Sequence, residues 1–373
     1  MLRRVGETID PKGAVVKIKD ASFPAPFASE LEYNSPVHGS WNIVHTGMQV
    51  PESIQIYVCA DNCMRGVVLT AAEMNAADRF SFVILEEQDL LNSNLEDITI
   101  EGVTDVLNKR GDHPKAVLLF TVCLHHFVGS NLDYIYSELG HRFPDICFIR
   151  CYMDPIMQKH GLTPDQKLRK AMYDPLPACE PDRKTVSIFG SDFALDESSD
   201  IRRLLKRYEY TVKELPACKT WQDLLDMSKG SLFIDCYPAG KYGMEAQAER
   251  LGRKHLYLPG SFDYDEIEKQ LKQLTDILGL PELTGEELVC ERESCEEALA
   301  KAKTLIKDMP ITLDYLYHPR PLGLAKLLLT HGFCVKAVYL DGISPEEKEE
   351  FLWLQKHAPE LELIATIQVK MRV

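Results

Sequence analysis

Short apolar runs alternate with amphipathic stretches along most of the chain, and this alternation predicts strands and helices in turn. Residues 54–58 and 117–122 are apolar and rich in β-branched side chains, and each run leads through a small turn into helical sequence. Further strands are predicted at residues 80–85, 146–152, 185–190, 212–215, 231–236, 255–259, 311–317, 334–340 and 361–367. Such alternation is typical of a mostly parallel sheet. The expected fold class is therefore α/β.

Three α/β units can be separated along the sequence. Residues 1–34 contain Pro24 and Pro26, which block long elements, and are expected to form an irregular N-terminal lead-in. The first unit is predicted at residues 35–180, and the stretch 174–184, rich in proline and charge, marks its boundary. The second unit is predicted at residues 184–308. The third, at residues 309–373, has three predicted strands and is expected to be short or truncated.

Composition narrows the class of protein. The chain has 373 residues, 45% hydrophobic and 27% charged, as in soluble globular proteins. Its net charge of −15 argues against a nucleic-acid partner, which needs a basic face. No apolar stretch suggests a signal peptide or a membrane span, and eleven scattered cysteines fit a reducing compartment. We expect a cytoplasmic protein. Neither a Walker A nor a G-x-G-x-x-G pattern indicates a nucleotide site.

Cysteines stand where several predicted strands end. Cys59 and Cys63 follow the first apolar run, Cys123 follows the second, and Cys236 ends a later one. Because the carboxyl ends of parallel strands lie together at one crevice, these thiols are expected to meet there, where they would suit a soft metal or an iron–sulfur cluster. Ordinary buried thiols are the alternative, since free cysteine is among the most buried residue types. The Cys-x3-Cys spacing alone is a weak signal.

Polar residues beside these cysteines are candidates for proton transfer. His125 and His126 follow Cys123 directly, so one of the two could face the crevice as a proton donor, although a hydrogen-bonded structural histidine is the alternative for each. Asp154 ends another predicted strand and is a candidate carboxylate, but Asp-Pro is also an ordinary turn signal. His38 and His45 fit structural and functional roles equally well.

Four stretches together resemble the nitrogenase component 1 family, which includes nitrogenase molybdenum–iron protein subunits and the dark-operative protochlorophyllide reductases. PVHGSW, IYVCADNCMRGV and LFTVCLHHFVGSNLD resemble the three cluster-binding loops of that family, in order and spacing. SLFIDCYPAGKYGMEAQAERLG resembles the segment that supplies the cysteine ligand of the active-site cofactor in the nitrogenase catalytic subunit. The resemblance runs from about residue 35 to the end of the chain.

The resemblance implies three Rossmann-like domains around a central cleft and an iron–sulfur cluster, of the [4Fe-4S] type, near a subunit interface. It implies Cys63 and Cys123 as cluster ligands and places Cys236 at the substrate cavity. Ser35 stands where the family usually has a cysteine, so the remaining ligand is open among Cys59, Ser35 and a residue of a partner chain. A homodimer, or a heterodimer with a related chain, is expected, with an ATP-hydrolysing iron protein as electron donor.

Three functions follow as hypotheses. The first is the catalytic, electron-accepting component of a nitrogenase-like, ATP-dependent reductase of an unidentified small molecule. Dinitrogen is not the expected substrate, because Ser35 departs from the family pattern and the segment that carries the nitrogenase cofactor histidine has no match. The second hypothesis is a non-enzymatic scaffold that assembles or transfers a metal cluster. The third is a small-molecule binding protein without a cluster.

Overall fold

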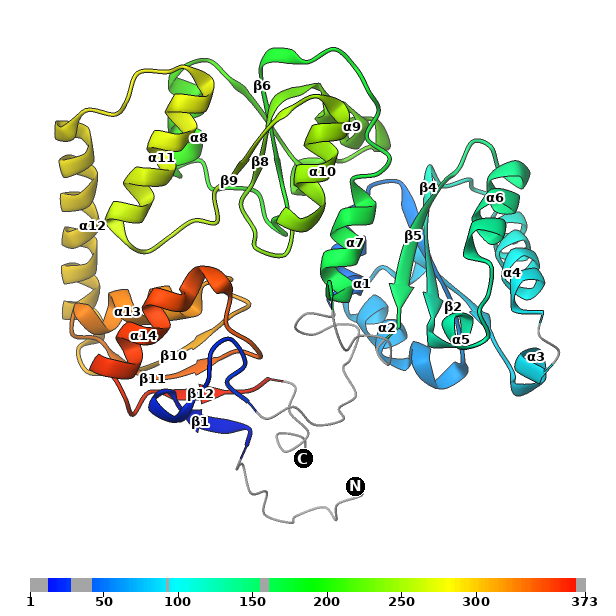
Figure 1. Ribbon diagram of the computed structural model, residues 1–373, viewed down its shortest axis with the longest axis horizontal. Coiled ribbons are helices and arrows are strands. Elements are labelled where there is room, and N and C mark those ends of the chain that lie inside the picture. Colours follow the sequence, from blue (N-terminus) through cyan, green and yellow to red (C-terminus); the bar gives the residue numbers. More distant parts are fainter. Residues whose placement is uncertain (1–12, 28–41, 92–93, 155–160, 367–373) are drawn as a thin grey trace. The chain divides into compact units, whose positions relative to one another are not determined.

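The structure of the protein is a computed structural model that describes residues 13–27, 42–91, 94–154 and 161–366 (Figure 1). These residues contain three four-stranded sheets, connected by helices. The chain divides into two compact units, one of residues 34–257 and one that joins the residues before 34 to residues 258–373. The predicted α/β class is confirmed. None of the helices in the described ranges is long and apolar enough to cross a membrane.

The first sheet has the strand order β3-β2-β4-β5, and all its strands are parallel. Every residue of β2 and β4 is buried, as expected for central strands that helices cover on both faces. Helices α4 and α6 pack together on one face, and α1 and α7 lie on the other (Figure 1). The strands are β2 (Ser53–Cys59), β3 (Phe80–Ile84), β4 (Ala116–Val122) and β5 (Cys147–Met153). The helices are α1 (Ile43–Gly47), α2 (Asp61–Glu73), α3 (Glu87–Leu91), α4 (Leu95–Arg110), α5 (Cys123–Phe127), α6 (Leu132–Arg142) and α7 (Pro164–Met172).

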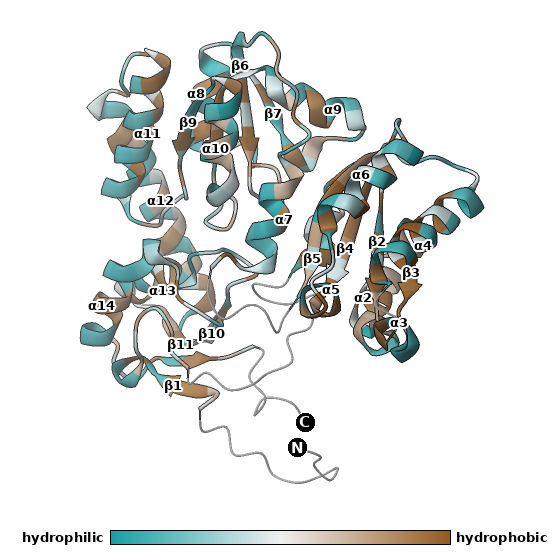
Figure 2. Cartoon of the chain, turned by 45° about the vertical axis from the view of Figure 1, so that its right-hand side comes forward, coloured by the Kyte–Doolittle hydropathy of each residue, from teal (hydrophilic) through white to brown (hydrophobic). Residues whose placement is uncertain are grey.

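The second sheet belongs to the same unit and has the parallel order β7-β6-β8-β9. Helix α7 packs against both β5 of the first sheet and α10 beside the second. One hydrophobic core therefore runs through both sheets. In Figure 2 the brown of hydrophobic residues is frequent along the strands. The strands are β6 (Asp182–Phe189), β7 (Thr211–Glu214), β8 (Gly230–Asp235) and β9 (Lys254–Tyr257). The helices are α8 (Asp200–Arg207), α9 (Trp221–Leu225) and α10 (Lys241–Leu251).

The third sheet lies in the other unit and has the order β1-β12-β11-β10. Strands β10, β11 and β12 are parallel, whereas β1 pairs with β12 in the antiparallel direction. Helices α13 and α14 lie on the same side of this sheet (Figure 1), because two right-handed crossovers follow one another in the same direction. The strands are β1 (Val15–Lys17), β10 (Pro310–Asp314), β11 (Cys334–Tyr339) and β12 (Glu362–Ile364). The helices of this unit are α11 (Tyr264–Leu278), α12 (Gly285–Ile306), α13 (Pro321–Thr330) and α14 (Lys348–His357).

Helix α2 and strand β1 both differ from the sequence-based expectation. Helix α2 begins at Asp61, two residues after β2 ends, so Cys63 lies in the first helical turn and not in the small turn expected after the strand. Its polar start carries no apolar periodicity, although Asp61 suits the positive end of the helix dipole. The expected irregular lead-in contains β1, which gives the third sheet a fourth strand. A strand of three residues is too short to show a reliable pattern.

Candidate functional site

Two strand-to-helix turns lie side by side at the carboxyl edge of the first sheet. Strands β2 and β4 are hydrogen-bonded neighbours, and their register aligns Tyr57 with Phe120. Strand β2 ends at Cys59 and β4 ends at Val122, so the two segments leave the sheet at the same level. Cys63 is the third residue of α2 and Cys123 is the first residue of α5. The sheet therefore brings together the two turns that the sequence singled out.

The thiols of these turns influence one another's protonation. Burial raises the pKa of Cys63, and the neighbouring Cys123 raises it further. Burial also raises the pKa of Cys59 to about 12, with a smaller effect from Cys63. The three thiols differ in access, because Cys63 is exposed, Cys123 is buried with 9% of its surface exposed, and Cys59 is wholly enclosed in the core. Cys63 is thus the accessible thiol of the three.

The donor set fits part of an iron–sulfur cluster. Such clusters are held mainly by cysteine sulfur, and two thiols on adjacent turns provide two of the usual four ligands. Within the part of the chain that the structure describes, no group of three or more His, Cys, Asp or Glu side chains is arranged to hold a metal ion. Ser35 and His38 lie outside the described residues. Further ligands would have to come from there, from Cys59 after a local rearrangement, or from another chain.

His125 is a buried residue whose two ring nitrogens are both engaged. Its Nδ1 accepts the backbone N–H of Val122 at 3.3 Å, and its Nε2 lies 3.1 Å from Thr99 Oγ1. Since Nδ1 is an acceptor, Nε2 carries the proton and donates to Thr99. Burial lowers the pKa of His125 to about 4, so the ring is neutral near pH 7. These contacts favour the structural interpretation: His125 fixes the start of α5.

His126 has the surroundings expected of a proton-transfer residue. Its side chain is partly exposed, and its Nε2 lies 3.3 Å from Oδ2 of the buried Asp154, which directly follows β5. Lys167 Nζ lies 3.8 Å from the same oxygen. Because β5 is the neighbour of β4, Asp154 ends its strand beside the Cys123 turn. The other histidine singled out, His45, is bonded to Asn42 at 2.8 Å in the start of α1.

Cys236 belongs to a second group, at the carboxyl edge of the second sheet. It follows β8 directly, is half-buried, and donates its backbone N–H to Phe189 O at 3.5 Å. Burial raises its pKa well above the ordinary value, and Asp235 and Glu214 raise it further. The turns after β6 and β8 touch, because a Cβ on Gly240 would lie 2.6 Å from the Cα of Gly190.

Arg169 is a site residue that sequence reasoning missed. Its guanidinium is 1% exposed and binds Asp165 Oδ2 at 3.0 Å, Asp192 Oδ1 at 2.7 Å and Gly190 O at 2.7 Å. It also lies 4.9 Å from the ring centre of Tyr237, the neighbour of Cys236. Arg169 therefore ties α7 to the turns of the second sheet. The one available signal was the capping sequence Thr163-Pro-Asp-Gln, which predicts a helix start.

The family follows from the sequence as a whole. Residues 100–370 match the profile of a family described as "Nitrogenase component 1 type Oxidoreductase". The chain belongs to this family. The match spans more than half of the chain and includes both the Cys123 turn and the Cys236 turn. The chain is therefore an oxidoreductase of the nitrogenase type, which confirms what the resemblance implied.

Solved structures of the family share the fold. Nitrogenase Cp1 at pH 6.5 is 11% identical, with a TM-score of 0.67 over 92% of this chain and 80% of that chain. Nitrogenase Cp1 at pH 5 is 12% identical, with a TM-score of 0.62 over 96% of this chain and 81% of that chain. No curated protein sequence is significantly similar to this chain. At such low identity the likeness supports the nitrogenase component 1 fold alone. The substrate and the cofactor have to be argued from the residues of the site.

Proposed function

We propose that this nitrogenase component 1 protein is the electron-accepting, catalytic component of an ATP-dependent reductase. The observation that carries the proposal is the pair of neighbouring thiols, Cys63 and Cys123, on adjacent strand-end turns. An iron–sulfur cluster of the [4Fe-4S] type, held by these two cysteines and by ligands from outside the described residues or from a partner chain, would supply one-electron redox chemistry there. An iron protein that hydrolyses ATP is the proposed electron donor, and the proposed setting is the cytoplasm.

The roles of the remaining residues follow from their surroundings. His126, which lies beside the buried Asp154, is the proposed proton-transfer residue at this edge of the sheet. Cys236 is proposed to line the cavity for a small-molecule substrate, and Arg169 positions its turn through Gly190 and Tyr237. His125 is assigned to the architecture of the Cys123 turn. Cluster ligands and substrate-binding residues are therefore proposed as two separate groups.

The test begins with protein purified without oxygen. Iron, sulfide and the broad visible absorbance of a cluster are expected in the unaltered chain and are expected to be lost in Cys63→Ala and in Cys123→Ala. The half-buried Cys147 and Cys334 are the matched controls, and their alanine variants should keep the absorbance. Cys236→Ala should keep the iron and impair turnover. Full iron content in Cys63→Ala, or full activity in Cys236→Ala, would contradict the two-group arrangement.

The exposure of Cys63 also favours a second function, a scaffold that holds a cluster and passes it on, because a cluster there would be open to an acceptor protein. Turnover separates the two functions. With its iron protein and ATP, a reductase consumes many equivalents of substrate per protein molecule. A scaffold transfers no more than one cluster per site. Absence of both iron and sulfide would leave the third hypothesis, a cluster-free binding protein.

A further inference from the structure

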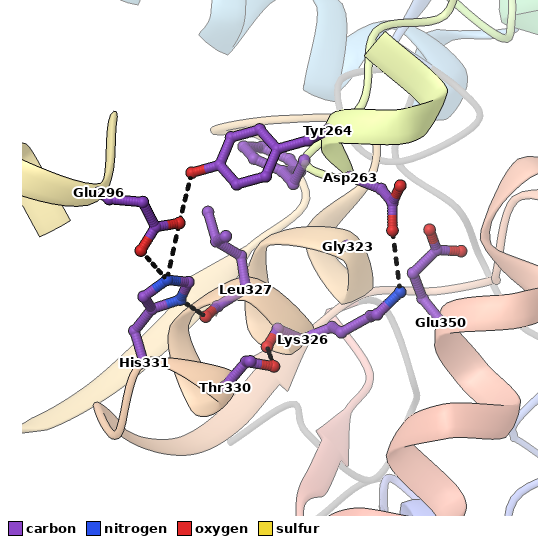
Figure 3. Close-up of a pocket in the computed structure, with 10 residues that line it drawn as sticks. Asp263, Tyr264, Glu296, Gly323, Lys326, Leu327, Thr330, His331 and Glu350 are labelled. Atoms are coloured by element: carbon purple, nitrogen blue, oxygen red, sulfur yellow. Dashed lines mark hydrogen bonds and ion pairs between the residues drawn. The ribbon is translucent and has the colours of Figure 1, made fainter. Parts of the chain in front are cut away.

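A pocket unrelated to the cysteine turns lies in the unit of residues 258–373. Its volume is about 310 Å³, at the lower end of the range for small-molecule sites. It is bounded by the start of α11, the middle of α12, and helices α13 and α14, and all of its lining residues belong to this one unit (Figure 3). Its walls combine two aromatic rings with several charged side chains.

Two charge pairs on the wall are balanced. Lys326 Nζ lies 3.4 Å from Asp263 Oδ2, and His331 Nε2 lies 3.0 Å from Glu296 Oε2 (Figure 3). His331 Nδ1 lies 2.8 Å from the carbonyl oxygen of Leu327, so both ring nitrogens face acceptors. This geometry favours the protonated imidazolium, and the pKa of His331 is raised accordingly, first by the Leu327 carbonyl. Neither pair leaves a net charge facing the pocket when His331 is protonated.

Glu350 is not balanced in this way. It is 5% exposed and lines the pocket, and its Oε1 accepts from Arg320 at 3.2 Å. That guanidinium is shared, because Arg320 also binds both carboxylate oxygens of Glu266, at 2.8 and 3.0 Å. One buried cation thus serves two carboxylates. Oε2 of Glu350 is buried and has no hydrogen-bond partner, so the negative charge of this carboxylate is only partly compensated within the fold.

The pocket's shape and chemistry point to an organic cation and away from a metal ion. The rings of Phe262 and Tyr264 stand at its wall, and aromatic faces attract ammonium groups. Gly323 lets the Phe262 ring pack closely on α13, since a Cβ there would lie 3.2 Å from the ring. No set of three or more metal-ligating side chains occurs among the described residues of this region. A ligand with a charged donor at one end and an apolar body would satisfy both the carboxylate and the rings.

We propose that this pocket binds a small organic cation whose primary ammonium group pairs with the carboxylate of Glu350 while its carbon chain lies against Phe262, Tyr264 and Leu327. The site is separate from the proposed reductase chemistry and does not depend on a cluster. Charge-assisted hydrogen bonds of this kind are stronger than neutral ones, so charge is expected to decide which ligand binds.

The probe is n-butylammonium chloride added to the purified full-length chain, with n-butanol and sodium butyrate as neutral and anionic probes of the same shape. Ionic strength is matched with sodium chloride, and saturable binding is followed by ligand-observed NMR and by the shift in Tm. Butylammonium should bind and raise Tm, whereas butanol and butyrate should do neither. Glu350→Gln should weaken butylammonium binding by about tenfold or more, the worth of a charge-assisted hydrogen bond.

Glu349→Gln is the matched control, because Glu349 is the exposed neighbour on the same helix, and its butylammonium affinity should be unchanged. If Glu350→Gln fails to fold, Leu327→Trp provides a second variant, which fills the pocket without touching a charge and should abolish binding. The proposal is overturned if butylammonium shows no saturable binding, if butanol binds equally well, or if Leu327→Trp keeps the affinity of the unaltered chain.

Discussion

Cys59 is the last residue of β2, with none of its surface exposed, and it packs within the hydrophobic core. A wholly enclosed thiol with a pKa of about 12 is poorly placed to bind iron without moving the strand. We therefore expect Cys59→Ala to keep the iron and visible absorbance of the anaerobic protein. The small cavity should lower the free energy of unfolding by about 1 kcal/mol in urea denaturation. Loss of iron in this variant would instead identify Cys59 as a ligand.

Glu347 offers a test of buried charge. It is 1% exposed and accepts the N–H groups of Leu322 and Gly323 at the start of α13. Burial raises its pKa from 4.5 to about 8, so the folded protein keeps a proton that the unfolded chain releases. The unfolding free energy should therefore fall as the pH rises from about 4.5 to 8.

In Glu347→Gln this fall should be smaller by roughly 1 to 3 kcal/mol, since one pKa unit is worth about 1.4 kcal/mol and the amide oxygen still accepts both N–H groups. Urea denaturation at pH 5 and pH 8 measures the difference. Exposed Glu349, changed to Gln, serves as the control and should leave the pH profile as it is. If the unfolding free energies of Glu347→Gln and of the unaltered chain change with pH in the same way, Glu347 is ionised in the folded protein.

At the site, the sequence predicted which turns meet but not which side chains are accessible. Cys63 and Cys123 were found because a cysteine at a strand end is visible in the pattern, and parallel sheets align strand ends. The pattern could not separate the enclosed Cys59 from the exposed Cys63, because access depends on where α2 begins. It also could not tell the buried His125 from the half-exposed His126. The burial of a side chain depends on tertiary packing, which neighbouring residues in the sequence do not reveal.

Helices α4 and α6 each contain one glycine, and the two make a matched pair. A Cβ on Gly102 of α4 would overlap the methyl groups of Val83 in β3, whereas a Cβ on Gly140 of α6 meets nothing within 4 Å. Gly102→Ala should lower the unfolding free energy by about 1 to 3 kcal/mol through overpacking. Gly140→Ala should raise it by up to about 1 kcal/mol, because alanine favours helix. Denaturant midpoints check both, and equal effects would contradict the packing of α4 on β3.

The elements that the sequence missed share a physical cause. Helix α7 has a charged sequence, yet it buries Asp165 and Arg169, so hydrophobic periodicity gave no sign of its inner face. Central strands such as β4 were found because every residue of a doubly covered parallel strand is apolar or small. Strand β1 was missed because its partner, β12, lies at the other end of the sequence. The local sequence pattern therefore predicts elements whose buried residues are apolar and which are long enough to show a period.

At the scale of the whole molecule, the proposed cluster lacks ligands within one chain. A cluster site with two strand-end thiols per chain, one of them exposed, is readily completed across a two-fold axis, and such dimers are the commonest oligomers. We predict a dimer, with itself or a related chain, whose interface lies near Cys59, Cys63 and Cys123. Light scattering of the anaerobic, iron-containing protein measures this. A monomer that retains its cluster would refute the prediction.

The pairing of β1 with β12 has a consequence for the order in which the chain acquires its structure during synthesis. Val15 pairs with Ile364, so β1 leaves the ribosome about 350 residues before its partner strand exists. At ordinary elongation rates the delay is roughly 20 to 70 s. All the strands of residues 34–257 emerge within that interval, so this unit can complete its two sheets first. A ribosome that stalls before β12 therefore carries a nascent chain in which residues 34–257 can already be folded. Its strand β1 is still unpaired and exposed to chaperones or to aggregation.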